Sequence, residues 1–338
     1  YRRTLGETVV VAITGSAGKT TTRRMLETVL AAKGPGSASP KSFNNDLGVP
    51  LTLLNARGDD RWLLVEVGTN APGEIRQLGA LVEPDMVLIT GIGQAHLEGL
   101  GNLQAVAKEK ASLLSTLRPG GMALVNTDQE GILPELTVYD CAIETFGHTK
   151  DADIRLLARR QVPGGQEIEV GDGFAAMLPL PGEHNAINAL GVYGIAKMMG
   201  MDNAAIQDGL ARVTPAPMRM ERVDLGDRVV WNDAYNANPE SMAAALATFV
   251  EEEEGTGRLV AVLGAMLELG AESEELHRKL GRMAARAALD VLIGVGSQGE
   301  TVVNAARDAG FTGVTRIVAL EQDPNAIAEW FFPGDRVL

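Results

Sequence analysis

The sequence predicts an α/β protein of two domains, each with a mainly parallel sheet covered by helices. In both halves of the chain, short apolar runs that read as buried strands alternate with helical stretches, which is typical of parallel sheets. Between the halves, the segment Thr214-Pro215-Ala216-Pro217 favours an extended linker because of its two prolines. We therefore expect one domain over residues 1–215 and a smaller α/β domain over residues 216–338.

The first domain is expected to alternate strands and helices as far as residue 126. From about residue 153 to residue 180 the pattern changes to short alternating segments with Gly-Gly and Asp-Gly turns, which indicates an antiparallel extension. The strands predicted in the parallel part cover residues 9–14, 62–67, 86–90 and 122–126. The predicted helices cover residues 19–33, 103–117 and 185–199, and one more helix is expected to begin at Pro72.

The second domain repeats the alternation on a smaller scale. Its acidic run over residues 251–254 is most simply a solvated helix end. The chain begins at Tyr1 and stops at Val337-Leu338, which reads as the start of a strand, so we expect both ends to continue in a longer protein. The predicted strands cover residues 229–232, 259–263, 291–295 and 316–319, and the predicted helices cover residues 240–254 and 274–288.

The composition suits a chain that builds hydrophobic cores, and it argues against several classes of partner. Hydrophobic residues make up 45% of the 338 residues and charged residues 22%. The net charge of −14 argues against nucleic acid and anionic membranes, and no apolar run approaches the length of a membrane span. A single cysteine, Cys141, excludes an internal disulfide, and no signal peptide opens the chain. We expect a cytoplasmic monomer.

A glycine-rich turn joins the first predicted strand to the first predicted helix, which is the setting of a phosphate-binding loop. Glycines let backbone amides point at phosphate oxygens, and the helix N-terminus adds a favourable dipole. The lysine neutralises the outer phosphates and the following threonine holds Mg²⁺. The motif is shorter than the common form, and an ordinary glycine-rich turn is the alternative. The predicted phosphate-binding residues are Gly15, Ser16, Ala17, Gly18, Lys19, Thr20 and Thr21.

Two further side chains follow predicted strands, at the edge where ligands bind in open α/β sheets. Glu66 ends an otherwise apolar strand and precedes Gly68-Thr69-Asn70, so we predict that it ligates Mg²⁺ rather than facing solvent. His96 follows the next strand by a short glycine-rich loop. From the residue alone, a packing or capping role for His96 is equally open.

Lys110 falls in the middle of the apolar face of the predicted helix over residues 103–117, whereas Lys108 and Glu109 lie away from its centre. A lysine in a buried stripe must find an anion, lose its charge or extend its side chain to solvent. The sequence leaves these three outcomes open. The residues of the apolar face are Leu103, Val106, Ala107, Leu113, Leu114 and Leu117.

A series of motifs resembles the Mur ligase family over nearly the whole chain. Four of them, Asn44–Pro50, His96–Gly101, Tyr235–Pro239 and Glu268–Ser273, are typical of the member that adds D-alanyl-D-alanine to a UDP-muramoyl tripeptide. The matching stretches are Thr14–Thr20, Ser42–Leu54, Glu66–Asn70, Pro72–Ile75, Ala95–Gly101, Pro181–Asn185, Asp233–Pro239 and Met266–Ser273.

The resemblance implies an ATP-dependent ligase that forms an amide bond in peptidoglycan precursor synthesis. It implies a UDP-sugar domain, an ATPase domain with a P-loop parallel sheet and a Rossmann-like C-terminal domain, of which this chain matches the last two. A substrate carboxylate attacks the γ-phosphate of ATP, and the amine of D-alanyl-D-alanine then displaces phosphate from the acyl phosphate. Lys19 and two Mg²⁺ ions are the implied stabilisers of the phosphoryl charge.

The resemblance also implies a role for individual residues. Thr20 and Glu66 hold the first Mg²⁺ and His96 helps to hold the second. Lys110 matches a lysine that is often N-carbamylated, which would turn a buried cation into an anion suited to Mg²⁺. Asn185, which as a helix N-cap has a structural alternative, is assigned to adenine. The remaining assignments are Arg219 to the γ-phosphate, Asp233 to ribose, Asn236 to the nucleotide-side loop, and Asn44 and Asn45 to the peptide substrate.

Two positions depart from the family pattern: Ala265 stands where an aspartate is usual, and Met218 stands where a glycine usually precedes the arginine. Alternatives within the chemistry are other amide ligases of the superfamily, such as a muramoyl-dipeptide or folylpolyglutamate ligase. A nucleotide-binding module without ligase turnover is an alternative of another class. A P-loop kinase gives no reason for the motifs of the second domain.

Overall fold

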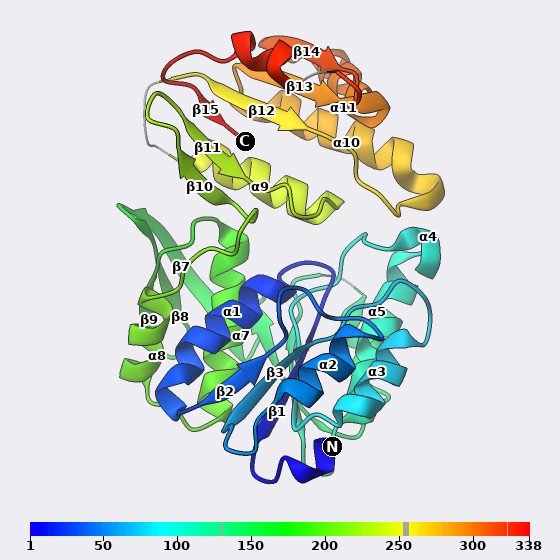
Figure 1. Ribbon diagram of the computed structural model, residues 1–338, viewed down its shortest axis with the longest axis vertical. Helices are drawn as coiled ribbons and strands as arrows, with labels where there is room; N and C mark the ends of the chain where they lie inside the picture. Colours follow the sequence, from blue (N-terminus) through cyan, green and yellow to red (C-terminus); the bar gives the residue numbers. More distant parts are fainter. Residues whose placement is uncertain (130, 253–256, 323) are drawn as a thin grey trace. The chain divides into compact units, whose positions relative to one another are not determined.

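The computed structural model describes residues 1–338 except residues 130, 253–256 and 323. The described residues form two units, Tyr1–Thr214 and Pro215–Leu338 (Figure 1). The division falls inside the proline-rich linker segment, one residue before the predicted boundary. Among the described residues, no helix combines the length and the apolar character needed to cross a lipid bilayer.

The first unit is built on one sheet with the strand order β2-β3-β1-β4-β5-β6-β7-β8-β9. Neighbouring strands from β2 to β7 are parallel, and β7, β8 and β9 are antiparallel, so the predicted antiparallel extension is confirmed. The predicted strands are present with bounds within one residue. The strands are β1 (Val9–Thr14), β2 (Gly36–Ala38), β3 (Trp62–Glu66), β4 (Met86–Ile89), β5 (Met122–Asn126), β6 (Ala142–Gly147), β7 (Ile154–Val162), β8 (Gly165–Val170) and β9 (Ala175–Leu178).

Helices cover both faces of this sheet. Alternate strand residues point to opposite faces, and Val11, Ile13 and Leu64 pack into the core formed with α1, α7 and α8. On the other face, α3 packs against α5 and β1. Short 3₁₀ turns lie at Arg2–Thr4, Ala31–Lys33 and Ser112–Thr116. The helices are α1 (Lys19–Leu30), α2 (Gly48–Asn55), α3 (Glu74–Val82), α4 (Leu97–Leu100), α5 (Leu103–Ala111), α6 (Ile132–Leu136), α7 (Glu183–Met198) and α8 (Asn203–Ala211).

The second unit has a smaller sheet with the order β10-β11-β15-β12-β13-β14, in which only the pair β10–β11 is antiparallel among the described pairs. Its strands are β10 (Glu221–Asp224), β11 (Val229–Asn232), β12 (Leu259–Leu263), β13 (Val291–Val295), β14 (Val314–Val318) and β15 (Arg336–Val337). Its helices are α9 (Pro239–Glu251), α10 (Ser273–Arg286) and α11 (Gly296–Asp308), with 3₁₀ turns at Gly270–Glu272 and Pro324–Trp330.

The predictions for the second unit hold with two adjustments. The strand predicted over residues 316–319 begins two residues earlier, and the end of the helix predicted over residues 240–254 lies outside the described residues. The start of α9 is built as its sequence indicates. Asn238 caps the helix by accepting from the Ser241 amide at 2.8 Å, and Pro239 is the first helical residue.

Candidate active site

The predicted phosphate-binding loop leaves β1 at Thr14 and enters α1 at Lys19. Its backbone requires glycine at two places. Gly18 has a φ of +85°, and a Cβ on Gly15 would lie 2.0 Å from the Thr90 hydroxyl. The loop is also tied to the segment after β4, because the Ser16 amide donates to the Gly91 carbonyl at 2.9 Å and the Ser16 hydroxyl donates to the Gly93 carbonyl at 3.0 Å.

Two residues that the sequence analysis did not single out hold this loop. Thr90, which follows β4, donates its hydroxyl to the Ala17 carbonyl at 2.5 Å. Asn188 is buried on α7, and its Oδ1 lies 2.5 Å from the position of a Cβ on Gly18. Asn188 stands one helical turn after Asn185, so the spacing of the two asparagines on one helix face was the signal that could have found it.

Lys19 folds back over the loop, where its Nζ donates to the Gly15 carbonyl at 2.6 Å. The ammonium group therefore stays at the turn whose amides are predicted to bind phosphate. Such a cation neutralises phosphate charge at close range.

The predicted metal side is a tight cluster of oxygen atoms beside the loop. Glu66 is fully buried at the end of β3, so the alternative of a solvent-facing carboxylate is wrong. The Thr20 hydroxyl donates to Glu66 Oε2 at 3.1 Å and lies 3.3 Å from the Ser42 hydroxyl. The Ser42 hydroxyl adds a further oxygen atom to this cluster, and the sequence had predicted no role for it.

The oxygen atoms of this cluster are of the type that Mg²⁺ binds in proteins. Thr20 Oγ1 donates to Glu66 Oε2 at 3.1 Å, so these two atoms lie at hydrogen-bond distance from one another. Among the described residues, no three His, Cys, Asp or Glu side chains gather in a metal-binding group. An ion here would accordingly rest on a mixed set of hydroxyl, carboxylate and phosphate oxygens.

Lys110 is fully buried in the core, with 1% of its surface exposed. The structure therefore excludes the alternative in which the side chain extends to solvent. No hydrogen bond or ion pair of its ammonium group is present in the described part of the chain. Burial lowers the pKa of Lys110 well below its ordinary value, nearby Lys19 lowers it further, and Glu109 opposes both. Lys110 is therefore within electrostatic range of the Lys19 ammonium.

Glu109 corrects the predicted pattern of this helix. It was expected to lie away from the centre of the apolar face, and it is nevertheless buried and accepts from the Gly73 amide at 2.8 Å and from the Ile75 amide at 2.9 Å. The carboxylate thus satisfies the first amides of α3 and joins that helix to α5. Leu103, expected on the buried face, is 37% exposed. The helix is α-helical only to Ala111 and continues as a 3₁₀ turn.

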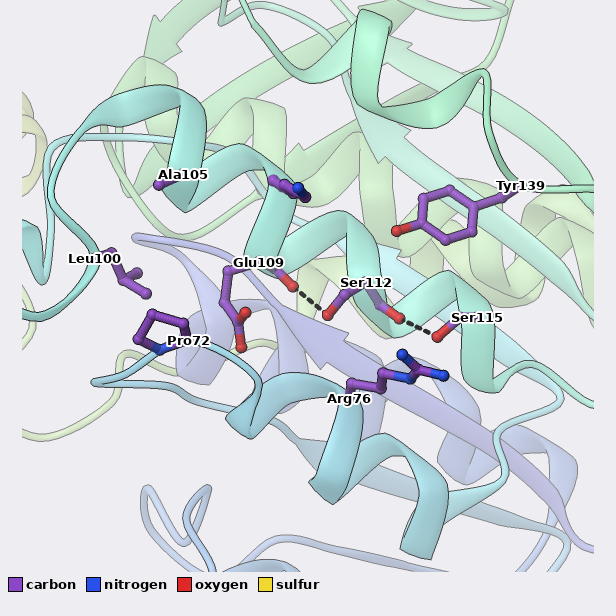
Figure 2. Close-up of a pocket in the computed structure, with 9 residues that line it drawn as sticks. Pro72, Arg76, Leu100, Ala105, Glu109, Ser112, Ser115 and Tyr139 are labelled. Atoms are coloured by element: carbon purple, nitrogen blue, oxygen red, sulfur yellow. Dashed lines mark hydrogen bonds between the residues drawn. The ribbon is translucent and has the colours of Figure 1, made fainter.

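A pocket of about 480 Å³ lies against the outer side of this helix pair (Figure 2). Figure 2 shows Glu109 between Pro72 and the residues Ser112 and Ser115, whose hydroxyls donate to backbone carbonyls. The lining residues include none of the predicted phosphate-binding or metal-binding side chains. We therefore place the candidate site at the phosphate loop, where Lys19 and the Thr20–Glu66 oxygen pair lie.

His96 occupies the N-cap position of the short helix α4 with a left-handed backbone, at a φ of +58°, and its side chain makes no capping hydrogen bond there. It is half-buried and lies close enough to Glu74 to influence that carboxylate. Hydrogen bonds from the Asn70 amide at 2.7 Å and the Ala71 amide at 3.2 Å lower the pKa of Glu74, and His96 lowers it further. This arrangement fixes the turn after β3 next to His96.

The predicted asparagine contacts occupy different settings. Asn185 is the third residue of α7 and donates to the Pro181 carbonyl at 2.7 Å, so the N-cap interpretation is wrong. Asn45 accepts from the Gly48 amide at 2.9 Å and supports the start of α2. Asn44 packs over Gly68, where a Cβ would lie 2.8 Å from its side chain.

In the second unit, the residues assigned to the nucleotide lie on two hydrogen-bonded segments, residues 218–220 and 233–236. The guanidinium of Arg219 stacks on the ring of Tyr235 at 4.4 Å. The carboxylate of Asp233 accepts from the Met220 amide at 2.9 Å. Burial raises the pKa of Asp233 to about 6, while the Met220 amide and Arg219 act in the opposite direction. Asn236 is exposed.

Met218, which stands where the family usually has glycine, has a left-handed backbone with a φ of +55°. This conformation costs a residue with a side chain about 1–2 kcal/mol, whereas glycine adopts it at little cost. Ala265, the other departure, is half-buried after β12. Its methyl group offers no hydrogen bond.

Comparison with known families covers both units. The sequence profile of the Mur ligase middle domain matches residues 13–196, and that of the Mur ligase glutamate ligase domain matches residues 218–338. The chain belongs to the Mur ligase family. The fold expected from the resemblance is thereby confirmed, with a P-loop unit followed by a smaller Rossmann-like unit.

Relatives of this Mur ligase chain are known in several bacteria. It is 34% identical over 302 residues to the UDP-N-acetylmuramoyl-tripeptide--D-alanyl-D-alanine ligase of Escherichia coli, covering 88% of this chain and 66% of the relative. It is 33% identical over 309 residues to the Bacillus subtilis ligase of the same name, covering 90% and 66%. The chain thus spans about two thirds of the length of these curated relatives.

Solved structures of Mur ligases have the same fold as this chain. A crystal structure of MurF from Acinetobacter baumannii matches with a TM-score of 0.89 and 29% identity, over 100% of this chain and 74% of that chain. The MurF ligase of Thermotoga maritima, solved in complex with ADP, matches with a TM-score of 0.85 and 26% identity, over 100% and 77%.

Proposed function

We propose that this chain carries the ATP site of a ligase that joins D-alanyl-D-alanine to a UDP-N-acetylmuramoyl tripeptide through an acyl phosphate. The observations that carry the proposal are the Thr20–Glu66 oxygen pair beside the phosphate loop and the fully buried Lys110, whose pKa is lowered by burial and by the Lys19 ammonium of that loop. A structural lysine would not be retained in a core without an anionic partner, whereas a ligand site explains it. The named relatives support the choice of substrates.

In this proposal the phosphates of ATP bind to the loop from Gly15 to Thr21. Thr20 and Glu66 hold one Mg²⁺, and His96 and Lys110 contribute to a second. The ions would screen the phosphate charge and draw electrons from the γ-phosphoryl group. Lys19 adds a positive charge that acts on the same oxygens.

Lys110 is proposed to be carbamylated. Because its folded pKa is lowered, its amine is available as a neutral nucleophile. The nitrogen lone pair attacks the carbon of CO₂, an N–C bond forms and one proton leaves to solvent. The product is a carbamate anion, which turns an unfavourable buried cation into a partner for Mg²⁺ and for the Lys19 ammonium.

The reaction then needs positioning more than acid–base chemistry. The terminal carboxylate of the peptide attacks the γ-phosphorus, which breaks the bond to the β-phosphate oxygen and gives ADP and an acyl phosphate. The amine of D-alanyl-D-alanine attacks the acyl carbon and expels phosphate, so one amide bond forms for each ATP cleaved. Lys19 stays beside the phosphoryl oxygens during both steps.

The remaining predicted contacts belong to the same proposal. Asn185 is assigned to adenine, Asp233 to ribose, Asn236 to the nucleotide-side loop, Arg219 to the γ-phosphate, and Asn44 and Asn45 to the peptide. We further propose a monomeric, cytoplasmic enzyme.

The test is phosphate release from MgATP with UDP-muramoyl tripeptide and D-alanyl-D-alanine, each omitted in turn. Release that requires both substrates, with a pentapeptide product by mass, supports the proposal. ATP binding without substrate-dependent release would mean a nucleotide-binding module, and release with another amino acid would mean a different ligase of the superfamily. A mass increase of one CO₂ on Lys110 tests the carbamate, and an unmodified lysine in a metal-loaded site refutes it.

A further inference from the structure

Arg23 contacts the candidate metal site, and no step of the proposed reaction uses it. It lies on α1, one turn after Thr20, and its side chain is only 7% exposed. Its Nε donates to Glu66 Oε1 at 2.7 Å, and its Nη1 donates to Glu27 Oε2 at 2.9 Å. A third donor group, Nη2, lies 3.5 Å from the Lys41 carbonyl. The guanidinium therefore bridges a buried carboxylate and a half-exposed one.

The two oxygens of Glu66 consequently have different partners. Oε1 receives the charge-assisted bond from Arg23, and Oε2 receives the hydroxyl of Thr20 at 3.1 Å. A turn of the carboxylate that freed Oε1 would leave a buried guanidinium without its closest anion, which is strongly unfavourable. Oε2 is the carboxylate oxygen that faces the threonine hydroxyl of the cluster.

We infer that Arg23 restricts Glu66 to one-oxygen metal ligation and thereby selects Mg²⁺ over Ca²⁺ at the nucleotide site. This inference rests on the proposed function. Mg²⁺ takes six ligands in near-ideal octahedral geometry, whereas Ca²⁺ takes six to eight and often binds a carboxylate through both oxygens. With Oε1 held by Arg23, the two-oxygen mode is closed.

Thr20 Oγ1 donates to Glu66 Oε2 at 3.1 Å, which is a hydrogen-bond separation, so the ion preference follows from which carboxylate oxygen is available and not from this spacing. Arginine suits this role because its planar fork can engage two carboxylates at once, which a lysine ammonium does less well.

The experiment compares three variants with the unmodified chain. Arg23→Met removes the bond to Glu66, Arg23→Lys keeps a positive charge with a shorter reach, and Glu27→Gln breaks only the outer contact. The measured quantity is the dissociation constant of a non-hydrolysable ATP analogue by calorimetry, with Mg²⁺ and with Ca²⁺. Their ratio gives the ion preference without requiring turnover, and thermal unfolding of each variant reports its fold.

Arg23→Met is expected to weaken Mg²⁺-dependent binding about 10–100-fold, as is typical when a partner of a metal ligand is lost. Its preference for Mg²⁺ over Ca²⁺ is expected to fall by a similar factor, with Arg23→Lys in between and Glu27→Gln unchanged. Arg23→Lys keeps the buried charge, so it tests the inference even where Arg23→Met does not fold.

An unchanged Mg²⁺ to Ca²⁺ ratio in a folded Arg23 variant overturns the inference and leaves the proposed function standing. Equal loss of preference in Glu27→Gln also overturns it, because the effect would then not pass through Glu66. Nucleotide binding that is independent of metal in the unmodified chain instead overturns the proposed function, and the inference with it.

Discussion

Replacement of Lys110 by methionine is expected to stabilise the protein while it removes the proposed carbamylation site. The side chain is 1% exposed and has neither a hydrogen bond nor an ion pair in the described part of the chain. Methionine has a similar length and no charge, so it fills the same volume without the cost of desolvating an ammonium group. Stability gained at the expense of function is common at active sites.

The size of the effect follows from proton linkage. Burial lowers the pKa of Lys110 in the folded state, whereas the unfolded chain keeps the ordinary value of 10.5. Between these two pKa values the unfolded state binds one more proton, so stability rises with pH by about 1.4 kcal/mol per pH unit. From pH 9 down to pH 7, the advantage of Lys110→Met is therefore expected to grow by up to about 3 kcal/mol. For the 214 residues of the first unit, that corresponds to about 5–10 °C in Tm.

The assay is thermal unfolding of the variant and the unmodified chain at pH 7 and pH 9, in buffer free of CO₂ and divalent metal. Lys108→Met is the matched control, because Lys108 is exposed on the same helix two residues away. The control is expected to shift Tm little and equally at both pH values. A Lys110→Met variant that is less stable than the unmodified chain, or whose advantage is the same at both pH values, would refute the reasoning.

Three further changes test the loop and the second unit. Gly18→Ala places a Cβ 2.5 Å from Asn188 Oδ1 at a φ of +85°. We therefore expect a loss of about 1–2 kcal/mol in the free energy of unfolding and weaker ADP binding. An unchanged ADP affinity by calorimetry would contradict this prediction. Thr90→Val keeps the shape but removes the donor to the Ala17 carbonyl, and is expected to cost about 1 kcal/mol in urea unfolding with a several-fold weaker nucleotide affinity. Asp233 has a raised pKa of about 6, so the folded state binds more protons between pH 4 and pH 6 and stability falls as pH rises. Asp233→Asn is expected to remove up to about 2 kcal/mol of that fall in stability, a value reduced because the Asp233 side chain is partly exposed. An unaltered pH profile of unfolding in the variant would contradict this prediction.

The regular parts of the fold were predictable because burial leaves a direct mark on sequence. Parallel strands covered on both faces are continuous apolar runs, so β1, β3, β4 and β5 were located within one residue. The strand β2 (Gly36–Ala38) was missed, since three small residues carry no apolar run and its pairing with β3 comes from the tertiary structure.

The candidate site was predictable where one motif supplies neighbouring residues, as in the phosphate loop. Lys110 was found because a charge in an apolar stripe breaks the helical pattern. The burial of Glu109 was not predicted, because its partners are the amides of Gly73 and Ile75, which are distant in sequence and leave no mark on the helical periodicity. Arg23 was missed for the same reason, since its partner Glu66 lies on another element.

The most direct test of the central claim follows the oxygen atoms of the substrate. UDP-muramoyl tripeptide labelled with ¹⁸O in its terminal carboxylate is incubated with MgATP, D-alanyl-D-alanine and the protein, and the released phosphate is analysed by mass spectrometry. If the carboxylate attacks the γ-phosphate, each phosphate released with the peptide product carries one ¹⁸O atom. Unlabelled phosphate accompanying the peptide product would contradict the acyl phosphate and the account built on it.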